Sequence, residues 1–287
     1  MAKYNTNTTK LSIHHTTYRS WTSCFWVGEE YLGKAIKDLG IRREDVIIAS
    51  KVFFNEGGLS KEAIKREIDQ SLLRLGTDYL DLYLIHRFDY NVPIKETMDA
   101  LNDLVKSGKV RSLGSSSILA YQMLMYQNLA KEKGYARFEV MENHYNLLYR
   151  EEEREMIPLC KELDVSLIPY SPLAAGHLTR INWDSDSIRS ISDDVAKRRY
   201  GASEDVDKLI VERVAELAKK RNIKMSEVAL SWLYKKGVAS PIIGASKTKY
   251  IDDAINALNV ELSDEEVSFL EELYVPHPLK GPIIKKN

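Results

Sequence analysis

Two ionisable side chains near the ends of buried strands carry the strongest chemical signal in this sequence. His86 follows the apolar run Tyr79–Ile85, whose length and Tyr, Leu and Ile content are typical of a strand buried on both faces. Taken alone, such a histidine is more often a structural cap of its strand. Lys51 changes that balance, because it lies in the second half of the run Val46–Val52 and a buried ammonium needs a partner or a function. Two such groups on successive strands indicate one site at the carboxyl edge of a sheet.

A regular framework for these side chains extends from Gly28 onward. Buried apolar runs predict strands, whereas apolar residues at three- and four-residue intervals predict helices. The predicted strands are Val46–Val52, Tyr79–Ile85, Val110–Leu113, Phe138–Met141, Val165–Ile168 and Pro241–Ile243. The predicted helices are Glu29–Leu39, Lys61–Leu75, Thr97–Lys106, Tyr121–Lys133, Glu151–Leu163, Asp205–Arg221, Glu227–Lys235, Lys249–Leu258 and, after a capping box at Ser263, a last helix to Leu273.

Strict alternation of strands and helices predicts a parallel sheet with right-handed crossovers. This pattern fits an open doubly wound sheet or a closed (β/α)8 barrel. The Gly-x-Gly-x-x-Gly turn of many nucleotide-binding open sheets is absent after an early strand. In a barrel, strand ends meet at one rim, which suits the polar or small residues found there. These are Lys51, His86, Ser116, Asn143, Tyr170 and Ser246. The sequence therefore favours an α/β fold, a (β/α)8 TIM barrel.

The composition excludes several classes of partner. A formal net charge of −1 over 287 residues predicts no basic surface for nucleic acid or for an anionic membrane. Cys24 and Cys160 are the only cysteines and lie far apart, so a reducing compartment is expected and a disulfide framework is not. The sequence has no apolar run of about 18 residues and no secretory start pattern. A soluble, cytoplasmic protein without a metal site is expected.

Six strand-end motifs resemble those of the aldo-keto reductase family, from about Gly28 to Gly281. They are Ser50–Val52, Leu84–Asp89, Leu113–Ser117, Glu142–Asn146, Tyr170–Ala174 and Ile243–Lys247. The run Asn143–Pro158 resembles the bacterial and fungal branch of general or aryl-alcohol-type reductases. The resemblance implies a (β/α)8 barrel enzyme that reduces aldehydes and ketones by hydride transfer from NADP(H), with a small-molecule carbonyl compound as substrate.

The resemblance also implies the roles of the first two residues. In the family a tyrosine donates the proton, a lysine held by an aspartate lowers the pKa of that phenol, and a histidine orients the carbonyl. Lys51 matches the lysine and His86 matches the histidine. The residue types suit these roles, because a cation favours the phenolate and a neutral imidazole can donate to a developing alkoxide.

A nicotinamide-binding set follows from the same resemblance. Ser116 and Ser117 match contacts to the nicotinamide amide, and Tyr170 matches the aromatic residue that stacks on the nicotinamide ring. Asn143 lies beside the position of the family glutamine, which is Glu142 here. An ionised acid accepts hydrogen bonds but cannot donate one, so a weaker contact is expected at that position.

The phosphate and adenine end of the cofactor has its own matching residues, which are Ser171, Leu173, Gly176, Ser246, Lys247 and Asp253. Gly176 permits close backbone approach, and Lys247 suits a 2′-phosphate. The segment Ile181–Ser203 is long and polar for a βα connection. We expect it to fold over bound dinucleotide, with Arg198 or Arg199 against phosphate.

The first 27 residues depart from the family pattern. Counting back without gaps from the helix start Gly28–Glu30 puts Tyr18 at the position of the family aspartate and Ser23 at that of the tyrosine. Neither helix nor strand periodicity is sustained there. We therefore expect an atypical, truncated or altered N-terminal segment over 1–27 and an aldo-keto reductase-like barrel domain over 28–287, incomplete at its first two strands. Either Thr16–Trp26 closes the barrel in part, with Tyr18 near Lys51, or the chain is poorly soluble and self-associates.

Two functions stay open from the sequence. The first is an NADP(H)-dependent carbonyl reductase, and the alternative is a non-catalytic NADP(H)-binding protein or an inactive truncated reductase. The alternative arises because the cofactor-side residues are present while the aspartate and tyrosine are not found. The sequence indicates neither the physiological substrate, nor a preference for NADP over NAD, nor an oligomeric state.

Overall fold

The computed structural model describes residues 11–14, 24–183, 199–245 and 247–285. The chain forms two compact units, the first made of Met1–Val140 with Ile283–Asn287 and the second of Met141–Pro282. The strands are β1 (Leu11–His14), β2 (Val46–Val52), β3 (Leu80–Ile85), β4 (Val110–Ser116), β5 (Phe138–Glu142) and β6 (Ser166–Leu167). The helices are α1 (Cys24–Asp38), α2 (Lys61–Leu75), α3 (Ile94–Lys106), α4 (Ala120–Lys133), α5 (Met156–Glu162), α8 (Glu204–Arg221), α9 (Met225–Lys235), α10 (Thr248–Asn256) and α11 (Asp264–Glu271).

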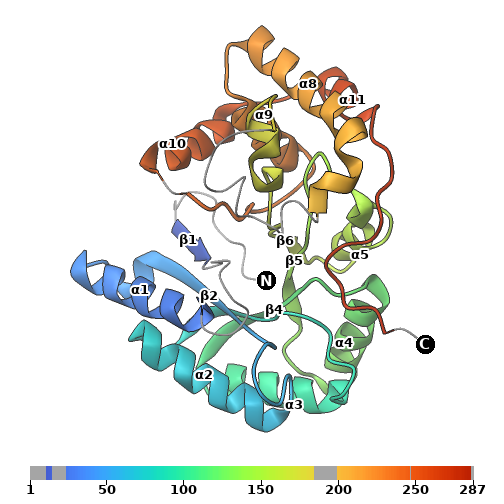
Figure 1. Cartoon of the computed structure of the whole chain (residues 1–287). Helices are drawn as coiled ribbons and strands as arrows, with labels where there is room; N and C mark the ends of the chain where they lie inside the picture. Colours follow the sequence, from blue (N-terminus) through green and yellow to red (C-terminus); the bar gives the residue numbers. More distant parts are fainter. Residues whose placement is uncertain (1–10, 15–23, 184–198, 246, 286–287) are drawn as a thin grey trace. The chain divides into compact units, whose positions relative to one another are not determined.

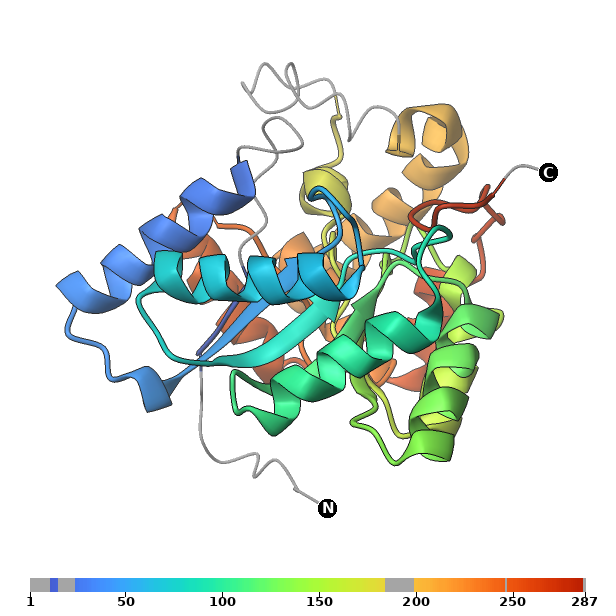
Figure 2. The same ribbon diagram turned by 90° about the horizontal axis from the view of Figure 1, so that it is seen from below.

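Parallel strands form the centre of the first unit. β1 pairs with β2, β2 with β3 and β3 with β4, each in parallel. Both faces of β3 are covered, since four of its six residues in succession, Leu82–Ile85, are buried. Helices α1, α2 and α3 lie side by side along these strands (Figures 1 and 2). Helices on the sheet and short βα connections are what the alternating pattern predicted.

The strands follow one another in the order β1-β2-β3-β4-β5-β6. This is the order of successive strands in a (β/α)8 barrel, and the α/β class is as predicted. Among the described residues no hydrogen-bonded pairing returns from β6 to β1, so the strand order stays open there. None of the described helices has the length and apolar character needed to cross a membrane.

The N-terminal residues include an element that periodicity did not predict. Leu11–His14 forms β1, whose partners are Val46–Ala49 of β2. Helix α1 also begins earlier than predicted, at Cys24 instead of Glu29. Four residues are too few to show the alternation of apolar and polar residues that predicts a strand. The strand forms because these residues pair with β2, more than 30 positions away in the sequence. The proposed closure by Thr16–Trp26 and the position of Tyr18 fall largely on residues 15–23, outside the described residues.

Helices dominate the second unit. Helix α9 is buried on almost every side, from Ser226 to Leu233, which is typical of a central helix. Helices α8 and α10 pack against it, and α11 packs on α8 (Figure 1). The Trp232 indole of α9 donates a 2.7 Å hydrogen bond to the Glu271 carboxylate of α11. The apolar ring of Trp232 is thus removed from water, and its polar N–H keeps a hydrogen-bond partner.

Two predicted elements of this unit differ in the structure. The predicted helix Glu151–Leu163 is divided into a 3-10 turn at Glu151–Glu153 and helix α5. Pro158 explains the break, because a proline ring clashes with the carbonyl four residues before it. The predicted strand Pro241–Ile243 is reduced to a single bridge between Ile242 and Tyr170.

A buried carboxylate holds the loop that follows β2. Asp89 accepts hydrogen bonds from the backbone N–H of Leu59 at 3.0 Å and of Asn91 at 2.9 Å. A Cβ atom at Gly58 would clash with the same carboxylate, and Gly58 has a φ of +54°. Asp89 thereby joins the loop after β2 to the loop after β3, at the edge where Lys51 and His86 lie.

We expect Asp89→Ala to lower the free energy of unfolding by about 1–3 kcal/mol, since it leaves two backbone donors in this region without their acceptor. Urea unfolding followed by circular dichroism measures the change. Asp38→Ala is the matched control, because the ion pair of Asp38 with Lys34 is exposed and its loss should cost less than about 1 kcal/mol. Equal effects of the two substitutions would contradict the role assigned to Asp89.

Candidate functional site

Strand register brings Lys51 and His86 to one face of the first unit. Lys51 lies opposite Leu84 of β3, and His86 is two residues beyond Leu84. Side chains alternate along a strand, so Leu84 and His86 share a face with Lys51. The backbone continues the ladder past β3, because the His86 N–H donates to the Val52 carbonyl at 2.9 Å.

The environment of His86 keeps its imidazole neutral. Burial lowers the pKa of His86 well below its ordinary value, and the positive charges of Lys51 and Arg87 lower it further. The effect of Lys51 on this pKa is consistent with the two side chains facing each other. A neutral imidazole beside a fixed cation can donate a hydrogen bond without becoming charged itself.

Ser116 joins the same face from β4. Gly114 lies opposite Leu84, so Ser116 is related to Gly114 as His86 is to Leu84. Ser116 is fully buried, and its hydroxyl has no hydrogen-bond partner among the described residues. Ser115 faces the other way and donates to the Met123 sulfur of α4. A buried hydroxyl without a partner is costly, which marks Ser116 as a group able to bind a ligand.

Ser117 follows the last residue of this strand in a strained conformation, with a φ of +47° and only 3% exposure. Non-glycine residues rarely adopt this left-handed geometry, and such strain is common at binding sites. Gly114 explains how β4 can lie so close to its neighbours. A Cβ atom there would come within 3.0 Å of the Val140 carbonyl oxygen and 3.1 Å of the Leu84 side chain.

A buried ion pair fixes the strand that carries Lys51. Glu29 of α1 accepts a 2.7 Å hydrogen bond from the Arg74 guanidinium of α2 and a 2.5 Å hydrogen bond from the Ser50 hydroxyl of β2. Glu29 itself is 7% exposed. Because both carboxylate oxygens are satisfied, α1, α2 and β2 are joined next to Lys51 by charge-assisted hydrogen bonds.

In the second unit, Glu142 and Asn143 lie at the carboxyl end of β5, both almost fully buried. The Asn143 amide is near Glu152, yet neither of its amide atoms makes a hydrogen bond of ordinary geometry among the described residues. Burial raises the pKa of Glu152 to about 7, although Asn143 favours its ionised form and Glu151 opposes it. The β5 end therefore holds an amide with unused hydrogen-bonding groups beside an acid that titrates near neutrality.

Tyr170 is part of an aromatic stack. The His144 ring stacks on Tyr170 with 5.3 Å between ring centroids and on Tyr149 with 4.3 Å. His144 Nε2 forms a 2.8 Å hydrogen bond with the Tyr200 hydroxyl. The Arg199 guanidinium lies over the Tyr170 ring, 5.1 Å from its centroid. These contacts fix the plane of the ring predicted to stack on nicotinamide.

The turn after Tyr170 is strained at successive positions. Ser171, Ala174, Ala175 and Gly176 all have positive φ, at +55°, +48°, +56° and +96°. The Ser171 hydroxyl accepts a 3.3 Å hydrogen bond from Arg199. Leu173 accepts one from the Gly176 N–H at 2.8 Å. Left-handed geometry at non-glycine residues costs about 1–3 kcal/mol each, and it is held here by the surrounding contacts.

At the predicted 2′-phosphate end, Lys247 is the exposed N-cap residue of α10. Asp253, predicted to lie near adenine, is buried on the same helix and forms an ion pair with Lys224. Ser246 and Arg198 lie outside the described residues, as do Tyr18 and Ser23. Of the two predicted phosphate ligands Arg198 and Arg199, the structure therefore describes the second.

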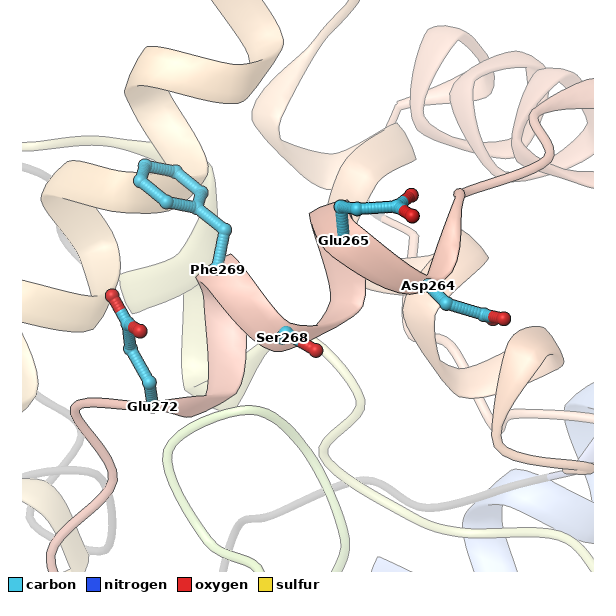
Figure 3. Close-up of a pocket in the computed structure, with 5 residues that line it drawn as sticks. All are labelled: Asp264, Glu265, Ser268, Phe269 and Glu272. Atoms are coloured by element: carbon cyan, nitrogen blue, oxygen red, sulfur yellow. The ribbon is translucent and has the colours of Figure 1, made fainter.

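The hollow drawn in Figure 3 is a different feature. Its lining side chains are Asp264, Glu265, Ser268 and Phe269 of α11 and Glu272, the residue that follows this helix. Asp264 pairs with Lys235 of α9, and Glu272 pairs with Arg213 of α8. Since these acids join α11 to its neighbours, the hollow is explained by packing within the second unit.

Two further residues of interest escaped prediction from the sequence. Phe54, three residues after Lys51, packs against His86, and the aromatic pair at the strand end was its available signal. Lys280 donates to the Arg199 carbonyl and its backbone N–H donates to the Tyr149 hydroxyl at 2.8 Å. Lys280 is 81 residues from Arg199 and 131 residues from Tyr149 in the sequence, so no local sequence pattern could predict these contacts.

The sequence profile of the Aldo/keto reductase family matches residues 27–275. The chain therefore belongs to the aldo/keto reductase family, whose members are (β/α)8 barrels. The match confirms the predicted family and fold class. It begins at the residue before Gly28, where the regular part of the sequence also begins.

Fungal proteins are among the similar curated sequences. An aldo-keto reductase of Fusarium vanettenii is 51% identical over 236 residues, which are 81% of this chain and 62% of that protein. A candidate aryl-alcohol dehydrogenase of Schizosaccharomyces pombe is 42% identical over 286 residues, covering 90% of this chain and 80% of that protein. The versiconal hemiacetal acetate reductase of Aspergillus parasiticus is 41% identical over 277 residues, covering 87% and 80%. The chain thus spans less than two thirds of the first of these relatives.

The raised pKa of Glu152 predicts a pH-dependent stability. An acid whose pKa is raised on folding stabilises the protein fully below its unfolded pKa, and this contribution is lost as the pH rises through the folded pKa. Between pH 4.5 and about 7, the free energy of unfolding of the wild type should therefore fall by up to about 3 kcal/mol relative to that of Glu152→Gln. Urea unfolding of both proteins across that range measures the difference.

Glu153→Gln is the matched control. Burial acts to raise the pKa of Glu153, but hydrogen bonds from Arg150 and Tyr145 prevail and hold it below its ordinary value. Its substitution should not reproduce the loss of relative stability on going from pH 4.5 to 7. Parallel pH profiles for wild type and Glu152→Gln would show that Glu152 is not a buried acid of raised pKa.

Proposed function

We propose that this protein is an NADP(H)-dependent oxidoreductase that reduces aldehydes or ketones to alcohols. The observation that carries the proposal is the convergence of Lys51, His86 and the buried Ser116 on one face, where β2, β3 and β4 end. A cation, a neutral hydrogen-bond donor and a buried hydroxyl that has no hydrogen-bond partner among the described residues suit the reduction of a carbonyl better than a purely structural role.

The residues present fit the cofactor that the family implies. A carboxamide both donates and accepts hydrogen bonds, as do the Ser116 hydroxyl and the Asn143 amide, which make no hydrogen bond of ordinary geometry among the described residues. Either the Ser116 hydroxyl of the first unit or the Asn143 side chain of the second unit could bind the carboxamide of a nicotinamide. Tyr170, fixed by its aromatic stack, offers a flat surface for a nicotinamide ring, and Lys247 offers a charge for a 2′-phosphate. When bound, NADP(H) supplies the hydride.

His86 and Lys51 would act on the carbonyl oxygen. The neutral His86 imidazole donates a hydrogen bond to this oxygen and orients it, and the Lys51 ammonium stabilises the negative charge that develops there. In the family a tyrosine donates the proton to this oxygen, but ungapped counting puts Ser23 at that position here, so water would supply the proton that converts the alkoxide to the alcohol. A missing general acid costs about 10²–10⁴ in rate, so slow turnover is expected in the absence of a substitute.

Names of the relatives suggest the kind of substrate. The Schizosaccharomyces pombe relative is named for aryl alcohols, and the Aspergillus parasiticus relative for a hemiacetal acetate. Aromatic carbonyl compounds and their alcohols are therefore the first class to test on this chain.

Lys51→Met and His86→Ala should each lower kcat/KM for NADPH-dependent reduction of a panel of aldehydes by about 10²-fold or more. Loss of absorbance by NADPH measures turnover, and circular dichroism checks the fold. Lys37→Met removes an exposed lysine of α1 and should leave turnover unchanged. Undiminished activity in both active-site variants would rule out the roles proposed for these residues.

A non-catalytic NADP(H)-binding protein is the second candidate function. The specific observation in its favour is that ungapped counting puts Tyr18 and Ser23 at the positions of the family aspartate and tyrosine, while residues that match the cofactor side are present. NADPH binding followed by fluorescence, without turnover of any carbonyl in the panel, would favour this candidate over the reductase.

Both candidates require NADPH to bind, which a charge reversal tests. Lys247→Glu puts a carboxylate at the N-cap of α10 and should raise the Kd for NADPH about tenfold or more, because it repels a 2′-phosphate. The Kd for NADH should change less. Lys219→Glu on the exposed face of α8 is the matched control. An unaltered Kd for NADPH in Lys247→Glu would show that Lys247 does not bind the phosphate.

A further inference from the structure

A cluster of aromatic and cationic side chains surrounds Phe54 in the first unit. The Phe54 ring meets the His86 ring edge to face, with 4.8 Å between centroids and 75° between planes. Phe53 meets Phe54 in the same way at 5.0 Å and 89°. The Arg87 guanidinium lies 5.8 Å from the Phe54 centroid. All four side chains are half-buried.

Phe54 is therefore the aromatic neighbour of the residue proposed to bind the carbonyl. A carbonyl oxygen that accepts a hydrogen bond from His86 would lie about 3 Å from the donating nitrogen of the imidazole. Aromatic rings interact at centroid separations of about 4.5–7 Å. A ring attached to the carbonyl carbon would consequently be within reach of Phe54, whereas a flexible alkyl chain gains less from the same contact.

The loop that holds Phe54 is anchored by its polar groups. The Asn55 side chain accepts from the Phe53 N–H at 3.1 Å and donates to the Gly58 carbonyl at 3.1 Å. Asp89 accepts from the Leu59 N–H. A ring held in place before binding loses little conformational entropy when a ligand arrives. These anchors do not involve the Phe54 ring, so the ring can be replaced without removing them.

We propose that Phe54 is a specificity-determining residue that selects aromatic over aliphatic carbonyl compounds by packing on the substituent of the reacting carbonyl. The inference rests on the proposed reductase function and deepens it by naming the residue that recognises the substrate class.

The selectivity ratio of a Phe54 variant tests this directly. The ratio is kcat/KM for benzaldehyde divided by kcat/KM for hexanal, both measured with NADPH. Phe54→Leu should lower it about tenfold, since it removes the ring but keeps an apolar side chain. Phe54→Tyr retains the ring and should keep the ratio within about twofold of wild type. An unchanged ratio in Phe54→Leu overturns the proposal.

Phe269→Leu is the matched control. Phe269 is also a half-buried phenylalanine, with the Arg213 guanidinium 4.3 Å from its centroid, but it belongs to α11 of the second unit. Its substitution should leave the selectivity ratio as in wild type. If Phe54→Leu does not fold, as judged by circular dichroism, Phe54→Met provides the same test with a side chain of similar volume.

Failure of the reductase function is distinguishable from failure of this inference. If the wild type reduces neither aldehyde, the proposed activity fails, and a calorimetric titration with benzyl alcohol in the presence of NADP⁺ decides the role of Phe54. Binding at least fivefold weaker in Phe54→Leu than in wild type supports the aromatic contact. Equal binding by the two proteins, or no binding by the wild type, overturns it.

Discussion

Lys51, Leu84 and Gly114 lie side by side in three parallel strands, and the candidate catalytic face depends on this register. A slip of one residue would turn every side chain of a strand to the opposite face. Lys51 and His86 would then no longer meet, and Ser116 would face α4 as Ser115 does now. The buried residues of β3 make such a slip costly, because an entire apolar set would exchange faces.

Polar groups buried behind this face maintain the register and the loops. Glu29 joins α1, α2 and β2 beside Lys51, and Asp89 joins the loop after β2, which carries Phe54, to the loop after β3. In the second unit, hydrogen bonds and ring stacking hold the Tyr170 plane and the strained turn after it. A buried polar group is costly unless it is paired. Each of these networks therefore favours the one arrangement of its loop in which all of its polar groups have partners.

Electrostatics separate the roles of the titratable groups. Desolvation and two nearby cations keep His86 neutral, which leaves it able to donate a hydrogen bond. At the end of β5, Glu142 is almost fully buried, and burial raises the pKa of a second acid, Glu152, to about 7. The resemblance to the family predicts matches at Lys51 and His86 and departures in proton donation and amide recognition.

Local patterns in the sequence determined most elements and the family. The ranges of β2 and α2 were predicted to the residue, since buried strands and capped amphipathic helices have strong local periods. Strand-end motifs likewise predicted Lys51, His86 and Ser116 as site residues, and the strand register places them on one face. Tertiary structure alone decided the pairing of Leu11–His14, the edge-to-face contact of Phe54 with His86, and the approach of Lys280 to Arg199. These depend on contacts between residues far apart in sequence, whose free energy no local period records.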